Sequence, residues 1–238
     1  MKHKKIIILI IILVIVLAIV IVPILRKRIW IYQVKDKFLG TIYDIKRNGN
    51  YHTVYFYKMK DNDNILASDA RIEIYAKDGE SVQINDFDNT DGTTSKTTII
   101  IKDGYEYNIL ERSDGAVNGI YRPIQWFHKI NTNNVIGDLL ANVIYNGHFK
   151  TMKEGKYKQK DCYIATVEYD DIEAQDTVYI DKETYLPIKI ESFDSTDGLY
   201  EEYEWVMLEV GTVKQLPEYD LKEIKEHAVS ALELNEKE

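Results

Sequence analysis

The stretch TVYIDKETYLPIKIES, residues 177–192, contains two alternating runs separated by a short charged loop that ends in a proline. Val178 and Ile180 share one side of the first run, and Ile188 and Ile190 share one side of the second. Successive side chains of a strand point to opposite faces, so each run has one apolar face. The pattern predicts a β-hairpin whose apolar face needs more sheet, a helix layer or a ligand to cover it.

Similar strand signals occupy most of the chain on both sides of this hairpin. The candidates before it are YHTVYFYKM (51–59), RIEIYAK (71–77), SVQIND (81–86), KTTIIIK (96–102) and YEYNILE (105–111). Later candidates are HFKTMKE (148–154), CYIATVEY (162–169) and YEEYEWVMLEV (200–210). Turns rich in Asp, Asn and Gly separate most of them, which predicts an antiparallel meander in a mainly β (α+β) protein.

The N-terminal segment is an uninterrupted apolar run. Residues 6–25 contain no charged or hydrogen-bonding side chain, and a helix over them would span about 30 Å, the thickness of a bilayer's hydrocarbon core. The run lacks the small-residue cleavage pattern of a signal peptide, and no cysteine follows it for lipid attachment. We therefore expect residues 1–28 to form one transmembrane anchor and residues 29–238 to form an extracytoplasmic β-rich domain.

The orientation of this anchor does not follow from charge alone. Lysines precede the run and Arg26, Lys27 and Arg28 follow it, so the positive charges on its two sides are nearly balanced. The short basic tail resembles that of a signal-anchor, which favours an N-terminus inside the cell. We expect a single-pass cell-membrane protein with its C-terminal domain outside the cytoplasm, and a cytoplasmic domain is the alternative.

Three further stretches have helical periodicity. An amphipathic helix is predicted over residues 30–47, where apolar residues recur at three- and four-residue spacing. A second aliphatic stripe predicts a short inserted helix over residues 133–145. The C-terminal stretch EYDLKEIKEHAVSALELNEKE (218–238) begins with a capping-box spacing and predicts a final helix.

Charge and motifs exclude several functions. The chain has 30 basic and 39 acidic residues and no Lys/Arg stripe with interleaved aromatic residues, so we expect no nucleic-acid partner. Its single cysteine, Cys162, excludes an intramolecular disulfide. Neither a nucleophile elbow, nor a phosphate loop, nor a zinc-protease motif is present, and the five histidines lie far apart. We therefore expect no enzyme activity, no metal site and no cofactor.

The hairpin VYIDKETYLPIKIESFD, the long Tyr-rich strand after it and the proline-marked QLPEYDL together resemble the LolA-like lipoprotein-carrier superfamily, which also includes periplasmic regulators of sigma-factor signalling. The resemblance is strongest from about Gly155 to Leu221. One departure is Tyr185, where the family pattern usually has glycine, and a bulky residue argues against a positive φ angle there. The resemblance implies a curved, half-open antiparallel β-barrel whose concave face is covered by inserted helices.

The resemblance also implies an activity, which is to hold a lipid, an acyl chain or an apolar segment of a partner in that concave face. The residues expected to line the cavity and its lid are Trp126, Phe127, Ile136, Leu139, Leu140, Val143, Ile144, Val178, Ile180, Ile188 and Ile190. The alternative is a filled core, in which a tethered sensory or regulatory domain binds another extracytoplasmic protein without a small ligand. The sequence leaves both functions open.

Overall fold

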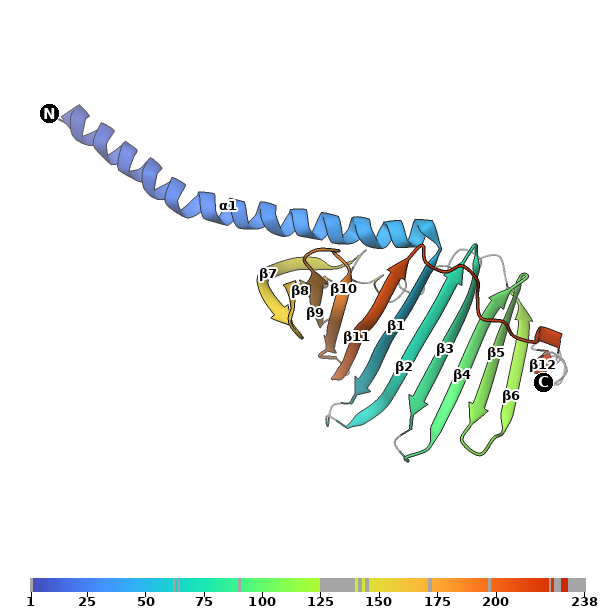
Figure 1. The fold of residues 1–238 in the computed structure, drawn as a ribbon. Coiled ribbons are helices and arrows are strands. Elements are labelled where there is room, and N and C mark those ends of the chain that lie inside the picture. The colour runs from blue at the N-terminus through green and yellow to red at the C-terminus, as the bar shows by residue number, and fades with distance from the viewer. Residues whose placement is uncertain are drawn as a thin grey trace.

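The part of the chain that the structure describes consists mainly of one long helix and one large sheet (Figure 1). The structure, a computed structural model, describes residues 2–61, 63, 65–89, 91–124, 140, 143, 146–170, 173–196, 198–222, 224 and 228–230. Helix α1 spans Lys2–Asn48. The strands are β1 (Tyr51–Lys60), β2 (Leu66–Lys77), β3 (Glu80–Asp88), β4 (Thr94–Lys102), β5 (Tyr105–Arg112), β6 (Val117–Pro123), β7 (His148–Tyr157), β8 (Lys160–Glu168), β9 (Ala174–Asp181), β10 (Pro187–Asp194), β11 (Leu199–Val210) and β12 (Ala228–Ser230).

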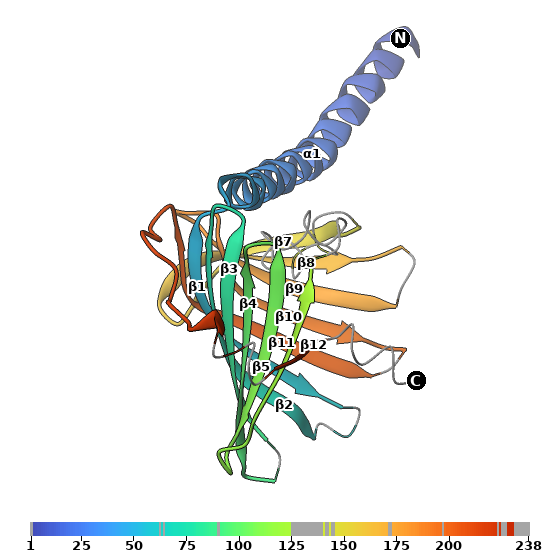
Figure 2. The ribbon, with the colours of Figure 1, turned by 90° about the vertical axis from the view of Figure 1, so that its right-hand side faces the viewer.

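The twelve strands form a single open sheet with the order β12-β6-β5-β4-β3-β2-β1-β11-β10-β9-β8-β7. Strand β1 pairs with β2 on one side and with β11 on the other, so two antiparallel meanders meet at β1. Among the described strands, β12 alone is parallel to its neighbour, β6. Figure 2 shows the sheet curving, with β7–β10 turned away from the plane of β3–β6. The predicted mainly β, antiparallel fold is confirmed, and the sheet does not close into a barrel.

Tight turns explain why neighbouring strands pair in sequence order. Asp78 and Gly79 connect β2 to β3 with φ angles of 52° and 88°, and Asp103 and Gly104 connect β4 to β5 with 52° and 79°. Positive φ at both central residues is typical of the type I′ turn, which matches the twist of a hairpin and favours Asp-Gly. The Asp-Gly pairs of the sequence therefore determine two of the joints.

Tyr185 also has a positive φ, of 57°. The prediction that its bulk would exclude such an angle is wrong. The loop around it is held by hydrogen bonds from the backbone N–H groups of Glu183 and Thr184 to Asp181 Oδ1, and from the N–H of Tyr185 to the carbonyl of Asp181. These bonds impose the conformation, and the phenol then reaches Lys37 of α1, whose Nζ donates to it at 3.2 Å.

Helix α1 packs on the sheet through its C-terminal third. Val34, Phe38, Ile42 and Ile45 are all buried, at the three- and four-residue spacing that predicts a helix over 30–47. Gly49 follows the helix with a φ of 61°, and its N–H donates to the carbonyl of Ile45. A glycine adopts this left-handed conformation without steric cost, so it ends the helix.

The structure contradicts the predicted localisation, a single-pass membrane protein with its C-terminal domain outside the cytoplasm. Among the residues whose side chains the structure describes, no helix is both long and apolar enough to cross a membrane.

Two predicted helices differ from the structure or lie beyond it. The inserted helix over 133–145 falls outside the described residues except for Leu140 and Val143. In the predicted C-terminal helix, Leu221, Lys222 and Ile224 are helical, whereas residues 228–230 form β12, which pairs with the edge of β6. Backbone hydrogen bonding to an unpaired sheet edge thus outweighs the helical pattern of this stretch.

The sheet buries apolar residues on both of its faces. We call the face that carries Tyr55, Ile74, Val178 and Trp205 the concave face, and the opposite one the convex face. The larger cluster lies on the concave face, where strands β7–β11, β1 and β2 pack against α1. A smaller cluster on the convex side of β3–β5 is covered by Leu216, Tyr219, Leu221 and Ile224.

Candidate ligand-binding face

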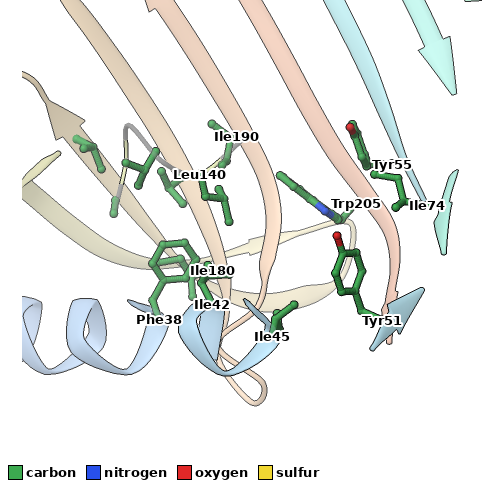
Figure 3. Packing of buried hydrophobic residues seen from close by; sticks show 14 of the residues in the cluster. Phe38, Ile42, Ile45, Tyr51, Tyr55, Ile74, Leu140, Ile180, Ile190 and Trp205 are labelled. Carbon is green, nitrogen blue, oxygen red and sulfur yellow. The ribbon is translucent and has the colours of Figure 1, made fainter. Parts of the chain in front are cut away.

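The structure brings together the described residues that were expected to line a cavity, with one exception. Leu140, Val143, Val178, Ile180 and Ile190 all belong to the concave cluster, and none is more than 4% exposed. Figure 3 shows several of them beside Phe38 and Ile42 of α1. The residues Trp126, Phe127, Ile136, Leu139 and Ile144 lie outside the described residues, and their role stays a prediction.

The exception is Ile188, which is buried but is not a member of the concave cluster. The pairing of β10 with β9 shifts register between Pro187 and Lys189, so Ile188 lies at an irregularity of the ladder. An extra residue in one strand breaks the strict alternation of faces. Strict two-residue alternation along the hairpin therefore does not predict where the Ile188 side chain lies.

Aromatic residues of β1 and β11 form the centre of the face. The rings of Tyr55 and Trp205 are 5.7 Å apart, and those of Tyr57 and Tyr203 are 5.0 Å apart (Figure 3 shows Tyr55 and Trp205). None of these four residues was among those expected to line the cavity. Their alternation in YHTVYFYKM and YEEYEWVMLEV places them on one face of each strand, which is the signal that could have identified them.

Two carboxylates lie where the concave face becomes polar. In the strand registers Ser192 of β10 pairs with Asp176 of β9 on one side and with Glu201 of β11 on the other. Tyr57 and Tyr203 donate hydrogen bonds to the two oxygens of Glu201, at 2.8 and 3.1 Å. The hydroxyl of Tyr169 donates to Asp176 Oδ2. At this end of the face, tyrosine hydroxyls therefore hold two carboxylates on the same side of three adjacent strands.

Burial changes the protonation of this group. Asp176 is 5% exposed, and burial raises the pKa of its carboxyl. The hydroxyls of Tyr169 and Ser192 oppose this rise, and the charge of Glu201 adds to it. Burial likewise raises the pKa of Tyr57 and Tyr203, and the carboxylate of Glu201 raises both further. The tyrosines consequently remain protonated hydrogen-bond donors at neutral pH.

Two buried polar atoms of the face have no hydrogen-bond partner within the part of the chain that the structure describes. They are Nε1 of Trp205, a donor, and Oδ1 of Asp176, an acceptor. Leaving a buried polar group unpaired costs about 1–3 kcal/mol, so native proteins rarely leave such atoms without a partner. The concave face therefore has both a donor and an acceptor available to another molecule.

The convex side of the same strands differs. Lys189 Nζ lies 2.8 Å from a carboxylate oxygen of Glu191 and 3.0 Å from one of Glu202. Glu204 accepts hydrogen bonds from Tyr157 and Lys158. Of the described residues, no group of three or more His, Cys, Asp or Glu is placed to hold a metal ion on either face.

No family model matches the chain, and no curated protein matches it in sequence. Solved structures do match. The Pseudomonas aeruginosa MucA/MucB complex is 14% identical with a TM-score of 0.37, and the match covers 79% of this chain and 60% of that chain. A LolA superfamily protein from Nitrosomonas europaea is 10% identical with a TM-score of 0.32, over 76% of this chain and 94% of that chain.

The Mycobacterium tuberculosis lipoprotein LppX is a third match, 8% identical with a TM-score of 0.40, over 76% of this chain and 98% of that chain. In two further MucB structures, one of them a complex with MucA, this chain spans only 59% and 61% of the matched chain. Likeness at such identities concerns the fold and does not transfer an activity.

Proposed function

We propose that this domain binds a ligand with an acyl chain, or another apolar segment, in the concave face of its sheet. The observation that supports this most directly is the continuity of the apolar cluster, which crosses β7–β11, β1 and β2. Along β8–β11, β1 and β2, the strand registers place no Lys or Arg on that face. A curved sheet with such a face can hold an apolar chain between its strands and the segments that pack on them.

The apolar contact alone supplies enough free energy for binding. Each methylene that leaves water contributes about 0.8 kcal/mol, so eight of them contribute roughly 6 kcal/mol before the costs of ordering. No reacting group is needed for this activity. Helix α1 covers one end of the face through Phe38 and Ile42, and Leu140 and Val143 also contact it, so a bound chain would lie beside these four residues.

The first test is extraction of the purified full chain with organic solvent, followed by mass spectrometry of the extract. We expect a ligand with a long apolar chain to copurify. A titration with a fluorescent long-chain fatty acyl probe then measures affinity. Val178→Phe, which fills space on the concave face, should weaken probe binding about tenfold, equivalent to about 1.4 kcal/mol.

The matched control is Tyr179→Phe, one residue further along β9 and therefore on the convex face. It should bind the probe like the unmodified protein, and thermal unfolding should show that both variants are folded. Absence of any extracted ligand together with no probe binding by the folded protein would overturn the proposal. That result would favour the filled core, with a protein partner in place of an apolar ligand.

A further inference from the structure

The polar end of the concave face indicates what the ligand carries beside its apolar chain. We infer that Asp176 and Glu201 receive the polar end of the ligand and that this end is a neutral, hydrogen-bond-donating group, such as the hydroxyls of an acyl glycerol, rather than a phosphate. This inference rests on the proposed function and names the chemistry of the head group at the same site.

The unpaired acceptor determines the donor character of the head group. Both oxygens of Glu201 already accept hydrogen bonds from tyrosines, whereas Oδ1 of Asp176 has no partner among the described residues although the side chain is 95% buried. A carboxylate oxygen accepts and does not donate unless it is protonated. One hydroxyl or amide N–H of a ligand, placed beside Ser192, would pair with it.

The charge of the site excludes an anionic head group. Two carboxylates flank Ser192, and the registers of the surrounding strands place no lysine or arginine on this face to pair with a phosphate. Like charges at close range in a partly dehydrated site repel each other strongly. A cationic head group is not required either, because the charge of Glu201 is already stabilised by two hydroxyl groups.

Trp205 provides a hydrogen-bond donor nearer to the apolar part of the concave face. Its indole Nε1 is a donor only, is unpaired within the described chain, and belongs to the same cluster as Ile190 and Val178. Trp205, Tyr203 and Glu201 follow one another at every second position of β11, so they lie in a row on one face. A ligand lying along this row would place an acceptor, such as an ester carbonyl, between its chain and its donor group.

The test compares two ligands with the same acyl chain, a monoacylglycerol and its phosphate ester lysophosphatidic acid. Each competes with the fluorescent acyl probe for the full chain below its aggregation concentration. We expect the monoacylglycerol to bind about tenfold more tightly or better. The double variant Asp176→Asn and Glu201→Gln should narrow this preference, because it removes the negative charge and the free acceptor.

Two further variants separate this effect from a general loss of structure. Glu202→Gln changes a carboxylate on the convex side of β11 and should leave the preference unchanged. Trp205→Phe should weaken both ligands by a similar factor, because both carry the same ester carbonyl, and should leave their ratio unchanged.

The outcomes separate the inference from the proposed function. If the acyl probe binds but lysophosphatidic acid competes as well as the monoacylglycerol or better, the head-group inference is wrong and the proposed function stands. The head-group inference is equally wrong if the probe binds and neither ligand competes. If the probe itself does not bind to the folded protein, the proposed function fails first.

Discussion

Neighbouring residues of β11 face opposite sides of the sheet and have opposite surroundings. On the convex face Glu202 and Glu204 are each within hydrogen-bond distance of a lysine, Lys189 and Lys158 respectively. On the concave face Glu201 accepts hydrogen bonds from the hydroxyls of Tyr57 and Tyr203, and from no lysine or arginine in the described part of the chain. The two sides of one strand thus use different chemistry to hold the same type of group.

The pKa directions follow this difference. Burial acts to raise the pKa of Glu191 and Glu204 on the convex face, but lysine and tyrosine hydrogen bonds outweigh it and lower both. Glu73 lies further along the convex face, and burial acts to raise its pKa as well. Hydrogen bonds from Tyr75, His52 and Arg71 outweigh burial and lower this pKa to about 2. On the concave face, by contrast, burial prevails and raises the pKa of Asp176.

The two faces of the sheet also differ in whether their polar groups already have partners within the described part of the chain. On the convex face Glu191 and Glu202 are paired with Lys189, and Glu204 is paired with Lys158. The concave face keeps a donor at Trp205 and an acceptor at Asp176 without partners among the described residues, in a more buried setting. Leaving these two buried atoms without partners costs free energy, which agrees with the proposed binding role of this face.

The largest predicted effect breaks the convex network. Lys189→Met would leave Glu191 and Glu202 facing each other without their shared cation, and the lysine is only 8% exposed. Removing one partner of a buried ion pair costs about 3–5 kcal/mol, and the partial exposure of both glutamates reduces the expected loss to about 2 kcal/mol. Urea unfolding monitored by circular dichroism would measure it.

The control for this variant is Lys153→Met, on the convex face of β7, where the side chain is exposed. We expect its free energy of unfolding to change by less than about 0.5 kcal/mol, as is usual for surface positions. Equal losses for the two lysines would mean that the convex network contributes nothing specific.

A smaller effect concerns Asp176 and depends on pH. Because the pKa of its carboxyl is raised in the folded protein, its contribution to stability is fully present below the ordinary value of 3.8 and is lost as pH rises through the folded-state pKa. Asp176→Asn does not titrate, still accepts from Tyr169 and is not repelled by Glu201. We expect it to gain stability over the unmodified protein between acidic and neutral pH, on the order of 1 kcal/mol, because an unpaired neutral amide is cheaper to bury than an unpaired charge.

Urea unfolding at a series of pH values would show this gain as a difference that grows with pH. Asp88→Asn, at an exposed position of β3, controls for the loss of one negative charge. A difference that stays constant or shrinks as pH rises would show that Asp176 is not held by burial in the way that the structure indicates.

Much of the sheet could be predicted because its signals are local. The strands over 51–59 and 71–111 and those from 148 onward have two-residue alternation and end at Asp-Gly or other turn residues. Strand β6, in contrast, contains Gly119 and Pro123 and carries no clear alternation, so the sequence does not indicate it. Strand β12 forms only because the edge of β6 is available for pairing.

The candidate site could be predicted only in part, for a related reason. Val178 and Ile190 were identified because their own hairpin brings them together. Trp205 and Tyr55 meet because β11 pairs with β1, across about 150 residues of chain, and no local pattern specifies that pairing or its register. The juxtaposition of Asp176 with Glu201 likewise requires the registers of β9, β10 and β11.

The smallest predicted effect concerns the turn between β7 and β8. Lys158 and Gln159 have φ angles of 44° and 72° with no glycine, unlike the two Asp-Gly turns. Gln159→Gly should stabilise the protein by about 0.5–1 kcal/mol, because a left-handed conformation strains a residue with a Cβ atom while glycine's greater freedom in the unfolded chain offsets part of the gain. Lys158→Gly relieves the same kind of strain but also removes the ion pair with Glu204 on the convex face. Thermal unfolding of both variants would measure their gains in stability, and a smaller gain for Lys158→Gly than for Gln159→Gly would give the contribution of this exposed ion pair. Equal gains for the two variants would show that the convex face depends on Lys189 and not on Lys158.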